Sequence, residues 1–158
     1  MADPIDELCR DHCRLLKLLQ ELYAPEELAA MQQENLVEEL EREFRAHARL
    51  EEELFHSRDG SAQALSLEAE YAAHVEEHRQ GDALLEELLA TEQPDELARR
   101  ARELGEWIAE HAAEEEKELF PRLRQTIGPN LPGRAENDTS RPATAPKPVP
   151  LKTMRRVK

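Results

Sequence analysis

The chain has 158 residues, a formal net charge of −14 at pH 7, 35% charged residues and 4% aromatic residues. This length is sufficient for one domain with a buried core. Ala, Leu, Glu and Arg dominate and favour helices, so the composition predicts an all-α domain. The acidic character argues against nucleic-acid binding by the domain. No apolar run reaches the ~18 residues of a membrane span, so no membrane association is expected.

The charge is unevenly distributed along the chain. Residues 128–158 contain seven Lys or Arg and two acidic residues, a net charge of +5, which leaves −19 for residues 1–127. This segment begins with Gly-Pro-Asn-Leu-Pro-Gly and continues rich in Pro, Thr and Ala, a composition typical of disorder. We predict a helical domain over residues 1–127 and a disordered, Pro-rich basic tail over residues 128–158. The tail could contact an acidic protein partner, which the sequence does not identify.

The two cysteines indicate a reducing environment. Cys9 and Cys13 lie on one predicted helical turn, a spacing poorly suited to a structural disulfide. No signal peptide is expected before Asp3, and we predict a cytoplasmic protein.

Apolar residues at the helical period predict four helices. Asp3 is a suitable N-cap for the first, and Pro4 suits its first position. Ala24-Pro25 marks a turn, after which residues 26–35 could form a separate short piece. The predicted ranges are about 4–23, 26–58, 61–90 and 94–127.

Each predicted helix carries metal-ligand side chains in the middle of its apolar stripe. Residues four apart on a helix project from nearly the same line, so such pairs point together into the core. A buried carboxylate without a partner costs several kcal/mol, which a metal-free core would leave unexplained. The residues are His12, His47, Glu51, His74, His78, His111 and Glu115. Five histidines and two carboxylates in an up-down four-helix bundle predict a dinuclear metal site. His56 lies off the stripe and is expected at the surface.

A weak internal repeat leaves undecided which glutamate of the fourth predicted helix, Glu115 or Glu116, belongs to the set. The segment from His47 to Phe55 resembles the segment from His111 to Phe120, which contains one extra residue. In a regular helix, Glu115 is rotated about 40° around the helix axis from His111, and Glu116 about 140°. The smaller angle favours Glu115. A local helical bulge would reverse that choice.

Imidazole together with carboxylate suits iron, zinc or manganese, and carboxylates that bridge two metals favour iron. The ordered set resembles the hemerythrin family, the HHE cation-binding domains, over residues 1–127. Trp107-Ile108 and Leu119-Phe120-Pro121 add to the resemblance. Oxygen-carrying members space the last pair one residue wider and use Asp, so the shorter spacing to Glu115 is more similar to the broader bacterial group.

The resemblance implies two non-haem iron ions with an oxo or hydroxo bridge. His74, His78 and His111 would bind one iron, and His12 and His47 the other, with Glu51 and Glu115 as bridges. Two octahedral irons need about twelve ligand positions, and these groups leave one position open, on the iron with two histidines.

Three functions follow as expectations. The first is dioxygen binding for storage, delivery or sensing, with an apolar surround of Leu15, Phe44, Trp107 and Ile108 that keeps water out. The second is diiron redox chemistry on peroxide or nitric oxide, with peroxidase- or catalase-like activity as the enzymatic interpretation. The third is iron sensing or buffering. In the first two cases the partner is dioxygen, another diatomic molecule or peroxide.

Overall fold

The computed structural model describes residues 3–56 and 68–127. The predicted start of the third helix near Ser61, the predicted end of the second near Arg58 and the predicted tail lie outside these ranges. The long helices are α1 (Pro4–Glu21), α2 (Ala30–His56), α4 (Glu68–Leu89) and α5 (Pro94–Glu114). A π-helical turn, η2 (Glu115–Leu119), continues α5 into α6 (Phe120–Ile127), and η1 (Pro25–Glu27) is a short 3₁₀ helix.

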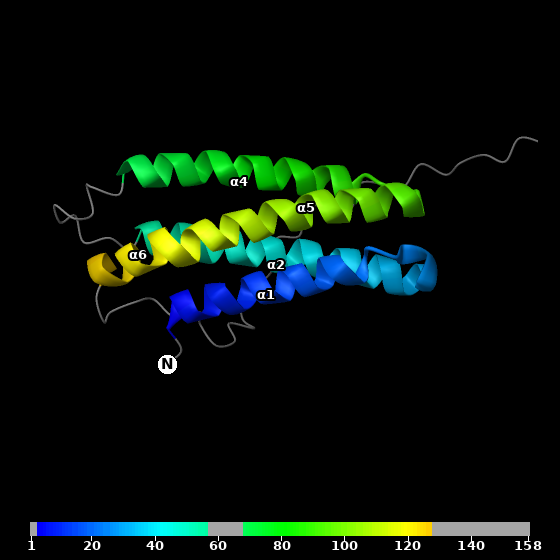
Figure 1. The fold of residues 1–158 in the computed structure, drawn as a ribbon, viewed down its shortest axis with the longest axis horizontal. Coiled ribbons are helices and arrows are strands. Elements are labelled where there is room, and N and C mark those ends of the chain that lie inside the picture. The colour runs from blue at the N-terminus through cyan, green and yellow to red at the C-terminus, as the bar shows by residue number, and fades with distance from the viewer. Residues whose placement is uncertain (1–2, 57–67, 128–158) are drawn as a thin grey trace, which may run out of the picture.

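The four long helices form an antiparallel bundle, with α6 extending the last of them (Figure 1). Helix α1 packs against α2 and α5, and α4 packs against α5 and α2. No strand occurs within the described residues. The predicted all-α, up-down-up-down four-helix bundle is therefore confirmed. Within the same ranges, no helix combines the length and the apolar character that crossing a bilayer requires.

The start of the bundle follows the predicted capping pattern. The Asp3 carboxylate accepts a hydrogen bond from the Ile5 backbone N–H at 2.9 Å, which satisfies one of the free donors of the first turn of α1. The separate piece expected after Ala24-Pro25 is only the three residues of η1. The Gln33 side chain donates to the backbone oxygens of Pro25 and Leu28, which ties this turn to the first turn of α2.

The core consists of two apolar clusters with a polar layer between them. The larger cluster contains Leu15, Leu18, Leu19, Leu22, Leu40, Phe44, Leu85, Leu88, Leu97, Ala101, Leu104 and Ile108. The smaller contains Ile5, Leu8, Leu50, Leu54, Phe55, Phe120 and Leu123. The buried histidines and glutamates fall between these clusters along the sequence of each helix, as in α1, where His12 lies between Leu8 and Leu15.

Candidate metal centre

The structure brings all seven predicted side chains together in this polar layer. Six of them are between 2% and 6% exposed: His12, His47, Glu51, His74, His111 and Glu115. The His78 side chain is 19% exposed, so it lies at the edge of the core and not fully within it as the stripe predicted. His56 is exposed, as expected, and its Nδ1–H donates to the Glu52 carbonyl oxygen at 2.7 Å.

The potential ligand atoms form two overlapping groups. Within each group, one nitrogen or oxygen atom of every member lies within 4.8 Å of those of all the others. The groups are Glu51, His74, His78, His111 and Glu115, and His12, His47, Glu51 and Glu115. Both carboxylates are common to the two groups, and the histidines divide three to two, which is the division that the resemblance implies. Metal ligation by each residue stays a prediction.

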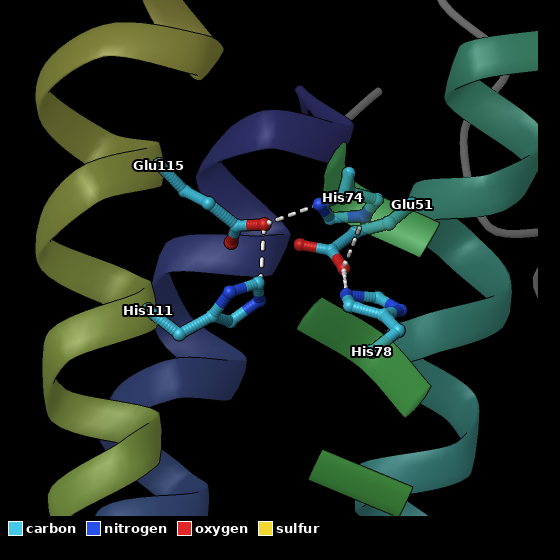
Figure 2. A group of neighbouring side chains, drawn as sticks. All are labelled: Glu51, His74, His78, His111 and Glu115. Atoms are coloured by element: carbon cyan, nitrogen blue, oxygen red, sulfur yellow. Dashed lines mark ion pairs between the residues drawn. The ribbon is translucent and has the colours of Figure 1, made fainter. Parts of the chain in front are cut away.

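Glu115 contacts histidines from three helices. Its carboxylate oxygens lie 3.0 Å from His111 Nε2, 3.1 Å from His74 Nδ1 and 3.2 Å from His12 Nε2. Figure 2 shows the carboxylate of Glu115 turned toward α4 and the imidazole of His74. A side chain that reaches three helices in this way is placed to be shared between two metal ions.

Glu51 has the corresponding position on α2. Its oxygens lie 3.2 Å from His47 Nε2, 2.8 Å from His78 Nε2 and 3.3 Å from His74 Nε2. The carboxylates of Glu51 and Glu115 thus approach the same space from opposite sides of the bundle (Figure 2).

Many of these atoms make no hydrogen bond, although they are buried. Within the described residues they are His12 Nε2, both nitrogens of His47 and His111, His74 Nε2, and both oxygens of Glu51 and Glu115. Buried polar atoms are nearly always hydrogen-bonded, and each one left without a partner costs about 1–3 kcal/mol. Close distances without hydrogen-bond geometry indicate that the atoms converge on shared space. Cations held there would satisfy them, and imidazole with carboxylate suits iron, zinc or manganese.

The charges of the metal-free cluster support each other. Burial alone lowers the pKa of His74, but the neighbouring Glu115 and Glu51 more than offset it and raise that pKa to about 10. Burial lowers the pKa values of His12 and His111 too, but the neighbouring carboxylates together outweigh it and raise both: Glu115, Glu116 and Glu51 at His12, and Glu115 and Glu51 at His111. Burial raises the pKa of Glu51, yet the surrounding imidazoles hold it well below its usual range. The carboxylates therefore favour the protonated form of His12, His74 and His111, and metal binding must displace those protons.

Two acids outside the predicted set contact the outer nitrogen of a histidine. His12 Nδ1–H donates to Glu116 Oε1 at 2.8 Å, and Glu77 Oε2 lies 3.4 Å from His111 Nδ1. Such contacts favour the tautomer whose Nε2 lone pair faces the site. Glu77 was not predicted. Its position three residues after His74, on a neighbouring line of the helix surface, was the only sequence signal.

The extra residue before Phe120 is accommodated by the π-helical turn η2. The turn begins at Glu115, so the spacing from His111 to Glu115 remains that of an α-helix. Glu115 is 3% exposed, whereas the Glu116 side chain is 44% exposed. The bulge that could have reversed the choice is present, but Glu115 is the carboxylate inside the cluster.

Aromatic rings position two of the imidazoles. Trp107 stacks on His111 with ring centroids 4.7 Å apart and planes 14° apart. Phe120 stacks on His12 with centroids 5.8 Å apart and planes 6° apart. These contacts fix the orientation of the imidazole rings before any metal binds.

A small cavity adjoins the cluster. Its volume is about 10 Å³, close to the lower limit of about 10–15 Å³ for holding one water molecule. Four of the five histidines line it: His12, His47, His78 and His111. The remaining wall is apolar and consists of Leu15, Phe44, Ala48, Trp107 and Ile108. Four of these five are the residues expected to surround the site.

A buried, histidine-rich cluster with two shared carboxylates inside an antiparallel four-helix bundle defines a metal-binding helical bundle protein. Residues 3–123 match the hemerythrin HHE cation-binding domain, and the chain belongs to this family. The resemblance predicted from the sequence is thus confirmed. The family and the histidine–glutamate cluster together indicate a metal-binding protein with iron as the metal. Comparisons with curated proteins and with solved structures found no significant match.

Proposed function

We propose that this chain is a non-haem diiron protein that binds dioxygen reversibly, for storage, delivery or sensing. The observation that carries the proposal is the cavity of about 10 Å³ against the cluster. It is at most the size of one water molecule, so a ligand there would have to be very small, and an organic substrate does not fit. Its apolar wall favours an uncharged ligand.

The seven clustered residues would hold the irons. The group with His74, His78 and His111 would bind one, the group with His12 and His47 the other, and Glu51 and Glu115 would be shared. When bound, the two irons supply the electrons and the open coordination position that reversible oxygen binding requires. The second group has fewer histidines, so an open position would belong to an iron held there; both its histidines line the cavity, as do His78 and His111 of the first group.

The apolar wall has a separate role, which is to exclude water. Leu15 is 1% exposed and Ile108 is 2% exposed, and both contribute to the wall. Water at the site would promote irreversible oxidation of irons held there. The apolar wall is therefore expected to slow autoxidation.

The test is anaerobic loading with ferrous iron, followed by visible spectra as oxygen is added and removed. We expect about two irons per chain and an absorption change that reverses when oxygen is withdrawn. Peroxide and nitric oxide are then added in turn to separate samples. Irreversible oxidation within seconds, with many turnovers of peroxide per site, would identify an oxidoreductase instead. If the protein binds iron but its spectrum does not respond to oxygen, iron sensing or buffering would be the remaining function.

The wall is tested with Ile108→Ala. This change enlarges the cavity and should admit water, so autoxidation should accelerate by about tenfold or more while the iron content changes little. Leu97→Ala is a matched control, because Leu97 lies on the same helix in the same apolar cluster and does not line the cavity. Equal autoxidation rates in the two variants would show that the wall does not control oxygen stability.

A further inference from the structure

Two surface clefts flank α4, and both reach His74. One lies between α4 and the continuous α5–η2–α6 segment and has a volume of about 190 Å³. We call it the acidic cleft, because its charged lining consists of Glu70, Glu77, Glu114, Glu115, Glu118 and Arg122. Arg122 forms an ion pair with Glu70, and His74, the other basic group of the lining, lies 3.1 Å from Glu115. Five carboxylates therefore face two basic groups in the cleft. The acidic cleft is therefore strongly negative.

The cleft on the other side of α4 differs in charge. Its volume is about 230 Å³, and its charged lining is Arg49, Glu52, Arg79 and Asp82. Two positive and two negative groups balance, so this balanced cleft gives a cation no comparable attraction. The two clefts have similar sizes and share His74 in their lining. Charge is the property that separates them.

The acidic cleft connects solvent with the buried cluster. The Glu118 side chain is 72% exposed and that of Glu77 is 40% exposed, while Glu115 in the same lining is 3% exposed. Glu77 Oε2 also lies 3.4 Å from His111 Nδ1. Both oxygens of Glu115 are buried and accept no hydrogen bond. A series of carboxylates thus leads from the exposed Glu118, through Glu77, to the buried Glu115, whose oxygens could bind a cation.

We propose that the acidic cleft is the route by which a divalent cation reaches the buried cluster, with Glu77, Glu114 and Glu118 as a transient docking site. A cleft lined by one sign of charge focuses the electric field and raises the local concentration of counter-ions. Carboxylate oxygens also suit a hydrated divalent cation. The small cavity shares no lining residue with the acidic cleft and offers no carboxylate to an incoming cation, so metal and dioxygen would approach by different routes. The proposal rests on the metal-binding part of the proposed function and not on oxygen binding.

The test measures how fast metal-free protein takes up cobalt(II) in a stopped-flow experiment, under anaerobic conditions and at low ionic strength. Cobalt(II) reports binding through its own visible absorption and needs no oxygen chemistry. The variant Glu114→Gln/Glu118→Gln removes two charges from the acidic cleft and keeps the side-chain size. The matched control, Glu52→Gln/Asp82→Asn, removes two charges from the balanced cleft.

We expect the loading rate of the acidic-cleft variant to fall about tenfold, with the same final stoichiometry, while the control changes less than about twofold. High salt should reduce the difference, because it screens exposed charges. Equal slowing in both variants would show general attraction by an acidic protein and overturn the route. Unchanged loading in the acidic-cleft variant would overturn it as well. Reduced stoichiometry in that variant would make its residues ligands and overturn transient docking.

The two proposals fail separately. Loading at the wild-type rate in the acidic-cleft variant removes the route and leaves reversible oxygen binding to its own spectroscopic test. Conversely, a protein that loads through the acidic cleft and shows no reversible oxygen response removes the oxygen proposal and keeps the route.

Discussion

Single buried side chains at this site connect helices as well as supplying charge. Glu115 contacts imidazoles from α1, α4 and α5, and Glu51 contacts imidazoles from α2 and α4. Removing one partner of such a buried pair leaves the other uncompensated, which costs about 3–5 kcal/mol. Single substitutions should therefore change both metal content and stability.

Histidine variants test the two groups separately. His78→Ala removes a side chain from the three-histidine group and His12→Ala one from the two-histidine group, so both should lower iron content, measured by elemental analysis. His56→Ala is the control, because His56 is exposed and outside both groups. An unchanged iron content in both ligand variants would contradict the proposed set.

The choice of carboxylate on η2 is tested by Glu115→Ala and Glu116→Ala. Glu115→Ala should abolish the diiron pair, since both groups include that residue. Glu116→Ala should retain two irons per chain. It should weaken their affinity by about tenfold, the lower range for loss of an outer contact to a ligand. Competition with a chelator measures both, and the reverse pattern would place Glu116 inside the cluster.

Gly81 is required by close packing against Trp107. A Cβ atom at this position would lie 2.4 Å from the Trp107 ring, which itself stacks on His111. Gly81→Ala gains about 1 kcal/mol of helix propensity, but overpacking costs about 1–3 kcal/mol, so we expect net destabilisation and lower metal affinity.

The matched control for this change is Gly105→Ala. Its Cβ atom would meet chiefly the Tyr23 hydroxyl oxygen, at the far end of that side chain, whereas the Cβ atom at Gly81 would meet three carbon atoms of the Trp107 ring. Urea unfolding of the metal-free proteins should show the larger loss for Gly81→Ala. A larger loss for Gly105→Ala would contradict the role assigned to Trp107.

At the scale of elements, η2 keeps the last helix in phase with the site. Phe55 follows His47 by eight residues, whereas Phe120 follows His111 by nine. One extra residue turns a regular helix by about 100° and would rotate Phe120 out of the core. The π-turn takes up this residue, and Phe120 is 2% exposed and stacks on His12.

Deletion of Lys117 tests this account, since its side chain is 80% exposed and lies within η2. The variant should form a regular helix with Phe120 still buried, and helicity and iron content should stay close to wild type. Deletion of the exposed Glu110, in the regular part of α5, should rotate His111 and Glu115 away and abolish iron binding. Circular dichroism measures helicity and elemental analysis measures iron content. An equal loss of iron in both deletion variants would show that η2 does not keep Phe120 facing the core.

At the scale of the whole molecule, the metal site links all four long helices. A ligand that binds only the folded state stabilises it by about 2.7 kcal/mol at a concentration of 100 Kd. Loading with ferrous iron under anaerobic conditions should therefore raise the melting temperature by on the order of 10 °C, and a strong chelator should reverse the increase. Magnesium is the control, because it prefers oxygen ligands and octahedral hydration. An equal increase with magnesium would show a general charge effect.

Helical periodicity predicted that the seven His and Glu side chains face the bundle interior, and the structure brings all seven together there. The angle between residues on one helix is fixed by local geometry, so seven ligand-type residues on four apolar stripes had to face the bundle interior. The limits of this reasoning lie at the stripe edges. Asp11 was not assigned to the stripe and is 3% exposed, while His78 was assigned to it and is only half-buried.

The family also followed from the sequence, because ligand type, order and spacing are properties of the chain itself. Only the tertiary structure decided the contacts between helices. Glu116 reaches His12 across 104 residues of sequence, Glu77 lies against His111, and the π-turn is placed so that Glu115 enters the cluster. The apolar cavity and the acidic cleft depend on the same information. Each requires the relative position and rotation of packed helices, which the periodicity of a single helix does not determine.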